Sequence, residues 1–216
     1  MFEKLPESIG HALQGRRAGL DKILFNRMDL RSGVAKLEVS SLAFADHGPI
    51  PMQYTADGEG ISPPLHWRGV PEAATTVALI VEDADSPTPE PLVHAIAVDI
   101  DPGHDRLSEG ELREGHSKGS PVNLGRNSYL KQAWLPPDPP PGHGKHRYAF
   151  QLFALTAGEP FSGAPGRDEF ATAIRERAIA SGCLIGIYER DSTVKSNDTE
   201  RSDELAATAP MLAAAT

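Results

Sequence analysis

Side chains that can bind an anionic oxygen stand at the ends of three apolar runs in this 216-residue chain. They are Asp83, His94, His146 and Tyr148. Imidazole and phenol groups donate hydrogen bonds, and a carboxylate beside an imidazole orients the ring and favours its protonated form. Buried polar groups are costly in isolation, so such a cluster requires mutual pairing, water or a ligand. The residue types therefore predict a small polar pocket for an anion.

Alternation along the three runs predicts that these side chains gather at one rim of a β core. Alternate residues of a strand point to one face. The predicted stripes are Val77, Leu79, Val81 and Asp83; His94, Ile96, Val98 and Ile100; and His146, Tyr148, Phe150, Leu152 and Ala154. If the first two runs pair as antiparallel strands, the Pro-rich connection of residues 84–92 returns the chain and brings Asp83 and His94 together.

Three other interpretations of the same residues stay open. Asp83 and His94 could satisfy only each other, as a clasp across a hairpin. Ser86 lies near both, which would suit a Ser-His-Asp hydrolase, although the chain has no Gly-x-Ser-x-Gly turn. Asp83, His94 and His146 also match the two-His, one-carboxylate set of non-haem iron sites, although neither His belongs to a helical i, i+4 pair.

With further motifs, these residues resemble the phosphatidylethanolamine-binding protein family, and more closely its bacterial Raf kinase inhibitor-like (YbhB/YbcL-type) branch. The resemblance runs from about residue 39 to about residue 190 and rests on the order and spacing of several short pieces. The pieces are Tyr54-Thr55-Ala56-Asp57-Gly58, Ser62-Pro63-Pro64-Leu65-His66-Trp67, Val70-Pro71, Asp83-Ala84-Asp85-Ser86-Pro87, Pro139-Pro140 and Gly144-Lys145-His146-Arg147-Tyr148.

The resemblance implies a mainly β fold in which a large central antiparallel sheet packs on a smaller sheet, with peripheral helices. It also implies an anion pocket lined by Asp83, His94, His146 and Tyr148, with Asp85, Pro87 and Pro140 shaping its wall. Two departures bear on pocket size and ligand choice. Ala95 stands where members commonly have Trp, and Trp134 lies where a Gly-Tyr pair is usual.

Composition agrees with one β-rich domain. The chain contains 20 Gly and 19 Pro, and its short apolar runs are separated by turn residues, which favours a sandwich over a helical fold. One helix is predicted over residues 167–181, because Phe170, Ile174 and Ala178 recur at a spacing of four and Gly182 follows as a stop signal.

The chain divides into three parts by composition. Residues 1–36 form an N-terminal helical extension, in which one amphipathic face is predicted from Ile9, Leu13, Leu20, Leu24 and Met28. We expect this extension to cover part of the sheet, with docking or dimerisation as the alternative, so a homodimer is a further expectation. Residues 37–190 form the binding domain. Residues 191–216 are rich in Ser, Thr, Asp, Glu and Ala and are interpreted as a loosely attached tail.

Charge and cysteine content limit the classes of partner. The net charge is −9, and because residues 1–36 carry seven basic against four acidic residues, the remainder stands at −12. An acidic body argues against nucleic acid. We find no apolar run long enough for a membrane span and no signal peptide pattern. The single cysteine, Cys183, cannot form an internal disulfide, so a cytoplasmic location is expected.

The surrounding sequence predicts the places of the Pro-rich segment and of the remaining histidines. The Pro-rich residues 135–142 lead directly into the third run, so they are predicted to form a rigid loop that shapes the mouth of the pocket. The remaining histidines lie in polar or turn-rich sequence and are predicted at the surface, with His143 at the lip of the pocket. They are His11, His47, His66, His104, His116 and His143.

The sequence thus favours a non-enzymatic binding protein for a small anionic group, phosphate-like or carboxylate-like, such as a phospholipid headgroup or a phosphorylated ligand. No cofactor or metal is expected. The resemblance also permits a different class, a kinase or protease regulator that acts through protein contacts with an unidentified target. Pocket variants that lose a protein partner would favour the regulator, whereas ligand binding with no stable partner would favour the binding module.

Overall fold

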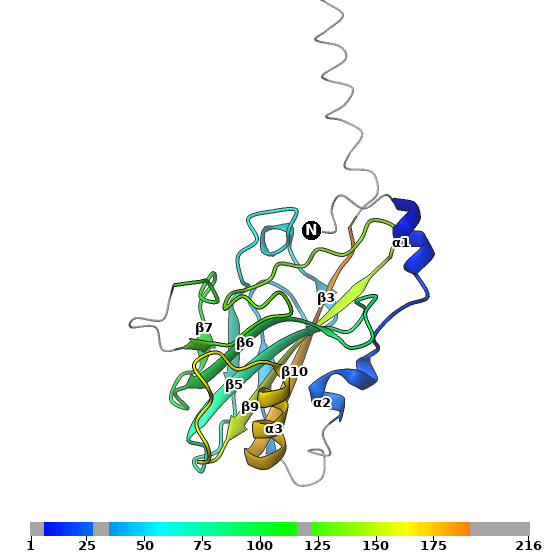
Figure 1. The fold of residues 1–216 in the computed structure, drawn as a ribbon. Helices are drawn as coiled ribbons and strands as arrows, with labels where there is room; N and C mark the ends of the chain where they lie inside the picture. Colours follow the sequence, from blue (N-terminus) through cyan, green and yellow to red (C-terminus); the bar gives the residue numbers. More distant parts are fainter. Residues whose placement is uncertain (1–6, 28–34, 116–121, 191–216) are drawn as a thin grey trace, which may run out of the picture.

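The computed structural model describes residues 7–27, 35–115 and 122–190. The predicted tail over 191–216, His116 and the Met28 end of the predicted N-terminal helix lie outside these residues. The described chain forms a large twisted sheet that is covered on one face by a smaller sheet and on the other by helices (Figure 1). The mainly β architecture expected from the sequence is confirmed.

The large sheet has the strand order β1-β10-β9-β5-β6-β8, with β3 also paired to β10. Its strands are β1 (Ala35–Lys36), β3 (Gly48–Pro49), β5 (Thr76–Asp83), β6 (Leu92–Ile100), β8 (Asn123–Leu124), β9 (His146–Leu155) and β10 (Ala178–Tyr188). The pairs among β6, β5, β9 and β10 are antiparallel, as is β8 with β6, whereas β1 and β3 run parallel to β10. The predicted antiparallel pairing of the first two apolar runs is therefore correct.

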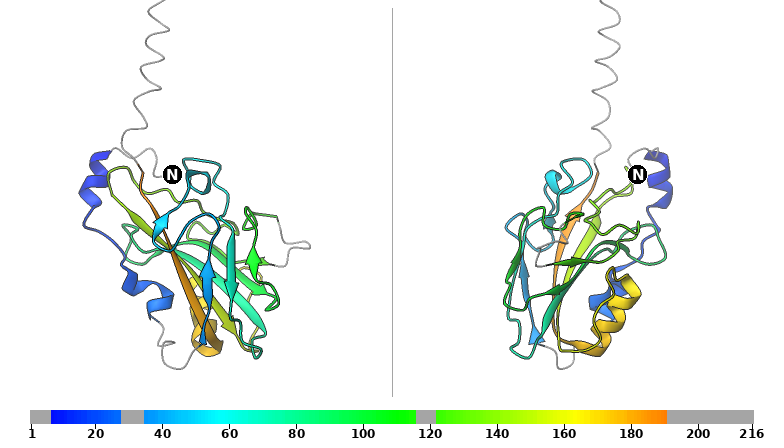
Figure 2. Two further views of the ribbon diagram at one scale, coloured as in Figure 1. Left: turned by 180° about the vertical axis from the view of Figure 1, so that it is seen from behind. Right: turned by 60° about the vertical axis from the view of Figure 1, so that its left-hand side comes forward.

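The smaller elements complete the layers. The second sheet has the order β2-β4-β7, formed by Glu38–Ser40, Leu65–Arg68 and Arg106–Leu107. The helices are α1 (Glu7–Leu13), α2 (Leu24–Arg27) and α3 (Arg167–Arg177), with single 3-10 turns η2 (Leu20–Lys22) and η3 (Met52–Tyr54). Figure 2 shows the smaller sheet on one side of the large sheet and α2 with α3 on the other.

Each face of the large sheet has its own apolar core, because β5 is apolar at every position from Val77 to Val81. Its odd-numbered residues in this range pack towards the smaller sheet, and the even-numbered ones pack towards α2 and α3. The first core contains Trp67, Phe150 and Leu152, and the second contains Phe153, Phe170 and Ile174. All eight residues of β5 are buried.

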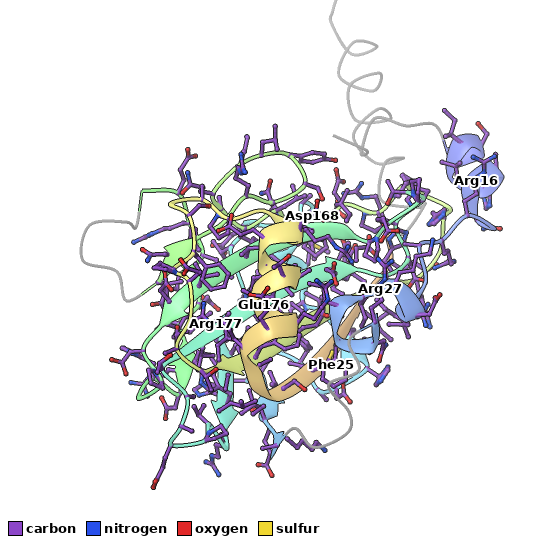
Figure 3. The ribbon with its side chains drawn as sticks, turned by 60° about the horizontal axis from the view of Figure 1, so that its bottom comes forward. Arg16, Phe25, Arg27, Asp168, Glu176 and Arg177 are labelled. Carbon is purple, nitrogen blue, oxygen red and sulfur yellow. The ribbon has the colours of Figure 1, made fainter. Side chains whose placement is uncertain are left out.

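A buried carboxylate fastens the helices to the second face. Glu82 is fully buried and accepts hydrogen bonds from the Leu24 amide at 2.9 Å, from the Gln151 side chain at 2.9 Å and from Arg167 Nε at 2.6 Å. One carboxylate on β5 thereby holds the first turn of α2 and the first residue of α3. Figure 3 shows these two helices side by side over the sheet, with Phe25 and Arg27 labelled on α2.

The structure corrects two predicted helices. The helix predicted over 167–181 ends at Arg177, and the chain continues as β10 from Ala178. The expected stop at Gly182 is wrong because Gly182 lies inside that strand, where an added Cβ would stand 2.4 Å from the Leu37 carbonyl oxygen. The N-terminal extension is not one amphipathic helix, since α1 ends at Leu13 and Gly19 adopts a left-handed φ of 103° before α2 begins.

The extension nevertheless packs on the sheet, with Leu24 in the core beneath α3. In the part of the chain that the structure describes, no helix combines the length and apolar character needed to cross a membrane.

Candidate functional site

A cavity of about 150 Å³ opens at the end of the large sheet where β5 ends and β6 and β9 begin. Asp83, His94 and His146 line it from these three strands. Its remaining wall comes from the turn after β5, which contributes Ser86 and Pro87, and from the Pro-rich loop, which contributes Pro136, Pro139 and Pro140 among others. Five residues predicted for the site thus meet at one cavity, namely Asp83, Pro87, His94, Pro140 and His146.

A β-bulge in β6 brings His94 into the cavity. Val81 pairs with Ala95 and Glu82 pairs with Val93, so His94 is an extra residue in the ladder. Ile96 and Val98 pack in the core under the helices, whereas the ring of His94 contacts Trp134 and Tyr148 on the other face. The prediction that His94 shares a face with Ile96 and Val98 is therefore wrong, because the bulge breaks the alternation on which it was based.

His94 presents an unpartnered ring nitrogen. Its side chain is 2% exposed, and Nδ1 lies 2.6 Å from the Leu135 carbonyl oxygen. A carbonyl can only accept, so Nδ1 carries the hydrogen of this bond and Nε2 is left without a partner in the described protein. Burial lowers the pKa of His94, more than the nearby Asp83 raises it. In the neutral ring, Nε2 is a free acceptor.

Tyr148, the other residue predicted to line the pocket, does not itself line the cavity, but its hydroxyl supplies a free donor beside the His94 ring. The ring is fully buried, meets His94 edge-on at a centroid distance of 5.0 Å, and stacks at 6.3 Å on His146. The hydroxyl is buried and has no hydrogen-bond partner among the described residues. Burial, reinforced by Asp83 and Asp138, raises the pKa of Tyr148 well above its ordinary value, so the hydroxyl keeps its proton. The alternation predicted for β9 is correct, since Tyr148, Phe150, Leu152 and Ala154 all belong to one core.

Asp83 and His146 are joined to a third side chain that sequence reasoning misplaced. His146 Nδ1 lies 2.7 Å from Asp83 Oδ2, and His146 Nε2 lies 2.6 Å from His143 Nδ1. His143 Nε2 in turn lies 2.8 Å from the Leu13 carbonyl oxygen at the end of α1. His143 is fully buried, so its predicted place at the surface is wrong. The signal that could have found it is its spacing of three from His146, between two glycines that adopt positive φ.

This chain of contacts changes the role expected for His146. Both ring nitrogens are already bonded within the protein, so neither is available to donate to an anion. The expectation that His146 donates directly is corrected by these distances. The imidazole instead lies against the Asp83 carboxylate, whose other oxygen accepts the Asp85 amide at 2.8 Å.

The family model described as phosphatidylethanolamine-binding protein matches residues 40–189. The chain belongs to the phosphatidylethanolamine-binding protein family. A UPF0098 protein of Mycobacterium bovis is 41% identical over 153 residues, which cover 71% of this chain and 70% of that one. A UPF0098 protein of Aquifex aeolicus is 34% identical over 177 residues, covering 80% and 99% of the two chains.

Solved structures agree with this assignment. The crystal structure of a phosphatidylethanolamine-binding protein homologue from Chlamydia trachomatis matches with a TM-score of 0.64 at 32% identity, covering 72% of this chain and 99% of that one. Escherichia coli YbcL, described as a member of the mammalian PEBP family, shares the fold with a TM-score of 0.67 at 24% identity, covering 72% and 99%. The family expected from the sequence motifs is confirmed.

Within this phosphatidylethanolamine-binding protein fold, Asp85 lies outside the cavity. Its carboxylate accepts bonds from Arg147 Nε at 2.7 Å and Nη2 at 2.7 Å, and it pairs with Arg17 at 3.0 Å. Desolvation raises the pKa of Asp85, but the hydrogen bonds from Arg147 and Arg17 outweigh this and hold the pKa below its usual value. The prediction that Asp85 belongs to the binding wall is therefore corrected. Asp85 instead holds Arg147, the residue between His146 and Tyr148, and so stabilises the start of β9 from outside the cavity.

The mouth of the cavity is held by a second clamp. Arg190 pairs with Asp138 at 2.6 Å and with Asp57 at 2.8 Å, and it also donates to the Pro139 carbonyl at 3.2 Å. The Pro-rich loop contributes Leu135, Pro136, Asp138, Pro139 and Pro140 to the lining, which agrees with its predicted place at the mouth of the cavity. Trp134 packs behind His94 and stacks on Phe150 at 6.0 Å, so the departure from the family pattern fills the core behind the site.

The two enzymatic alternatives lack the geometry they need. Ser86 Oγ bonds to Thr88 Oγ1 at 2.7 Å and accepts the Leu92 amide, and no contact joins it to His94 or His146 within the described chain. In the same residues, no group of three His, Cys, Asp or Glu side chains is placed to hold a metal ion. In the two-His, one-carboxylate set considered for iron, His146 has no nitrogen left for a metal, because both ring nitrogens are already bonded within the protein.

Proposed function

We propose that the chain is a non-enzymatic binding protein whose cavity takes a small anionic group, phosphate-like or carboxylate-like, together with one proton. One observation carries the proposal: two fully buried polar atoms, Tyr148 Oη and His94 Nε2, lack a partner in the described protein and lie on neighbouring rings. Such atoms cost free energy unless they are satisfied, so they point to a bound group.

The two atoms are chemically complementary to an acid oxygen. The Tyr148 hydroxyl donates to one oxygen of the ligand. Neutral His94 cannot donate from Nε2, because its hydrogen is on Nδ1. An anion therefore binds at His94 only when a proton lies between Nε2 and the ligand, whether the ligand carries it in or the ring takes it from solvent. Anion binding accordingly requires one proton.

The surroundings suit a small group of modest charge. The cavity of about 150 Å³ lies below the roughly 300–1,000 Å³ of sites for drug-sized ligands, so a headgroup-sized anion fits better than a large one. Two carboxylates line the cavity and would repel an anion, but each is paired: Asp83 lies 2.7 Å from the imidazole of His146, and Asp138 lies 2.6 Å from the guanidinium of Arg190. Proline rings form much of the remaining wall.

Calorimetric titration with sulfate tests the proposal. The charge of sulfate is constant across the range used, so any pH dependence belongs to the protein. We expect saturable binding that weakens as pH rises above the lowered pKa of His94, with uptake of about one proton per anion in buffers of different ionisation enthalpy. Phosphorylethanolamine and acetate then separate phosphate-like from carboxylate-like ligands.

The matched variant is His94→Gln, which keeps a polar side chain but cannot titrate. Its sulfate affinity is expected to be weak and nearly independent of pH. Binding by the wild type that shows no pH dependence and no proton uptake would refute the role given to His94. An absence of saturable binding by any of the three anions would refute the function itself.

A further inference from the structure

Helix α1 docks directly on the loop that carries His143. Gly10 lies so close to this loop that an added Cβ would stand 1.8 Å from the Pro141 carbonyl oxygen. Gln14, just beyond the helix, donates to the Gly142 carbonyl at 2.6 Å. Figure 1 shows α1 beside the start of β9, and Figure 3 shows it well apart from α2, with Arg16 labelled. The helix therefore reaches the site through this loop, and the segment that follows the helix contacts the turn after β5, where the Ala18 amide donates to the Ser86 carbonyl at 3.0 Å.

The bond between His143 and the Leu13 carbonyl determines which ring nitrogens of the site carry a hydrogen. The Leu13 carbonyl only accepts, so His143 must donate to it from Nε2. In a neutral His143 ring, Nδ1 is then an acceptor, and His146 must donate to it from Nε2. His146 must also donate from Nδ1 to the Asp83 carboxylate. Three bonds need three hydrogens, whereas two neutral imidazoles and a carboxylate have two.

The docked arrangement therefore holds an extra proton beside the cavity. This count follows from the three donated hydrogens and holds whichever of the two imidazoles carries the extra one. The trio of Asp83, His146 and His143 then has no net charge. Among the described residues, the other charged or titratable groups that act on it are His94 of β6, Arg147 and Tyr148 of β9, and Arg17 of the N-terminal segment, whose Nη2 donates to the His143 carbonyl at 3.0 Å.

Without the Leu13 carbonyl, a different set of hydrogens suffices. His143 can then carry its hydrogen on Nδ1 and donate to His146 Nε2, so that a neutral His146 donates only to Asp83. The bonds within the trio are kept with two hydrogens, and the trio carries one negative charge beside the cavity. Because that charge repels an anion, undocking of α1 weakens anion binding.

We propose that docking of α1 and binding of an anion in the cavity stabilise each other, and that His143 is the positioning residue that links them. This rests on the proposed function. Coupling of this kind is reciprocal. We expect it to change anion affinity about tenfold, within the roughly 5–150-fold range of typical coupling between sites.

A pair of glycine variants tests the coupling. Gly10→Ala forces α1 away from Pro141, while Gly15→Ala adds the same methyl group where nothing lies within 4 Å. We expect Gly10→Ala to bind sulfate about tenfold more weakly at neutral pH and to take up close to two protons per anion instead of one. Gly15→Ala is expected to match the wild type. Equal affinity in the two variants would overturn the coupling.

A second pair acts on His143 itself. Glutamine can donate to Leu13 and accept from His146, which mimics the docked ring, whereas leucine can do neither. His143→Gln is therefore expected to keep most of the sulfate affinity and His143→Leu to lose it. Loss of affinity in both variants to the same extent would indicate a merely structural role and overturn the proposal.

Hydrogen exchange gives the reciprocal measurement. The Arg16 amide donates to the Leu13 carbonyl at 2.7 Å, so its exchange reports on the end of α1. Saturating sulfate is expected to slow this exchange several-fold in the wild type and not in His143→Leu. If the wild type binds none of sulfate, phosphorylethanolamine and acetate, the proposed function fails and the coupling fails with it. If it binds sulfate but Arg16 exchange is unchanged, the coupling alone fails.

Discussion

Replacing Tyr148 by Phe should move stability and binding in opposite directions. The substitution removes one oxygen atom from a fully buried ring whose hydroxyl has no partner among the described residues. Leaving a buried donor unsatisfied costs about 1–3 kcal/mol. Taking the low end, because water can enter the neighbouring cavity, the Phe variant gains about 1 kcal/mol in the free energy of unfolding. For a chain of this length that is a rise of about 2–4 °C in Tm.

The same oxygen is the donor proposed for the bound anion. A hydrogen bond to a charged group contributes about 1.5–3 kcal/mol. Its loss therefore weakens anion affinity by roughly 10- to 150-fold, at about 1.4 kcal/mol per factor of ten. The variant should be more stable than the wild type and bind sulfate much more weakly. Thermal unfolding without ligand and calorimetric titration at fixed pH measure the two effects separately.

Tyr188 provides the matched control. Its hydroxyl donates to Asp57 Oδ2 at 2.6 Å, so it is a tyrosine of β10 whose donor is satisfied. Tyr188→Phe should lower the free energy of unfolding by about 1 kcal/mol, as for an ordinary lost hydrogen bond, and leave sulfate affinity almost unchanged. If Tyr148→Phe instead behaves like Tyr188→Phe, the Tyr148 hydroxyl already has a partner and the reasoning from unsatisfied atoms is refuted.

Two further predictions concern stability. Because burial puts the pKa of His94 below the value of about 6.5 that it has when unfolded, the unfolded chain binds the extra proton, so stability is highest above about pH 6.5 and is lost as pH falls towards the folded pKa. Denaturant unfolding across pH should show this slope, and His94→Gln should reduce it; an unchanged slope would assign it to other groups. Replacing Glu82 by Ala leaves Arg167 and Gln151 without their buried acceptor, and it should lower the free energy of unfolding by about 3 kcal/mol. Sulfate affinity in that variant should stay near the wild-type value, and a loss of binding would show that the two faces of the sheet are not independent.

The alternation of residues along a strand correctly predicted which side chains share a face in the regular strand β9. It failed in β6, which is irregular. In β9, paired on both edges with β5 and β10, every second residue from His146 lies on one face as expected. In β6, the extra residue at His94 and the positive φ of Asp99 shift the pattern twice. Neither irregularity has a signal in the sequence, because His94 is flanked by apolar residues that fit a regular strand equally well.

Contacts between residues far apart in the sequence also could not be predicted. The helix prediction ran past Arg177 because Ala178 continues the spacing of four, and only the pairing of residues 178–188 with β9 converts them into a strand. His143 was placed at the surface because its neighbours are glycines and prolines. Its burial depends on α1, which lies about 130 positions earlier in the chain. The family motifs identified the fold, whereas the hydrogen-bond chain required coordinates.

The full burial of β5 has a dynamic consequence. The strand is hydrogen bonded on both edges and covered on both faces, so its amides should open only when the whole domain unfolds. Asp83 is the last residue of this strand, and His146 is bonded to it. The floor of the cavity is thus attached to the most slowly exchanging part of the protein, and its shape does not depend on local unfolding. The residence time of a bound anion should therefore depend on the rim, where Leu135, Pro136, Pro139 and Pro140 line the cavity, and not on opening of β5.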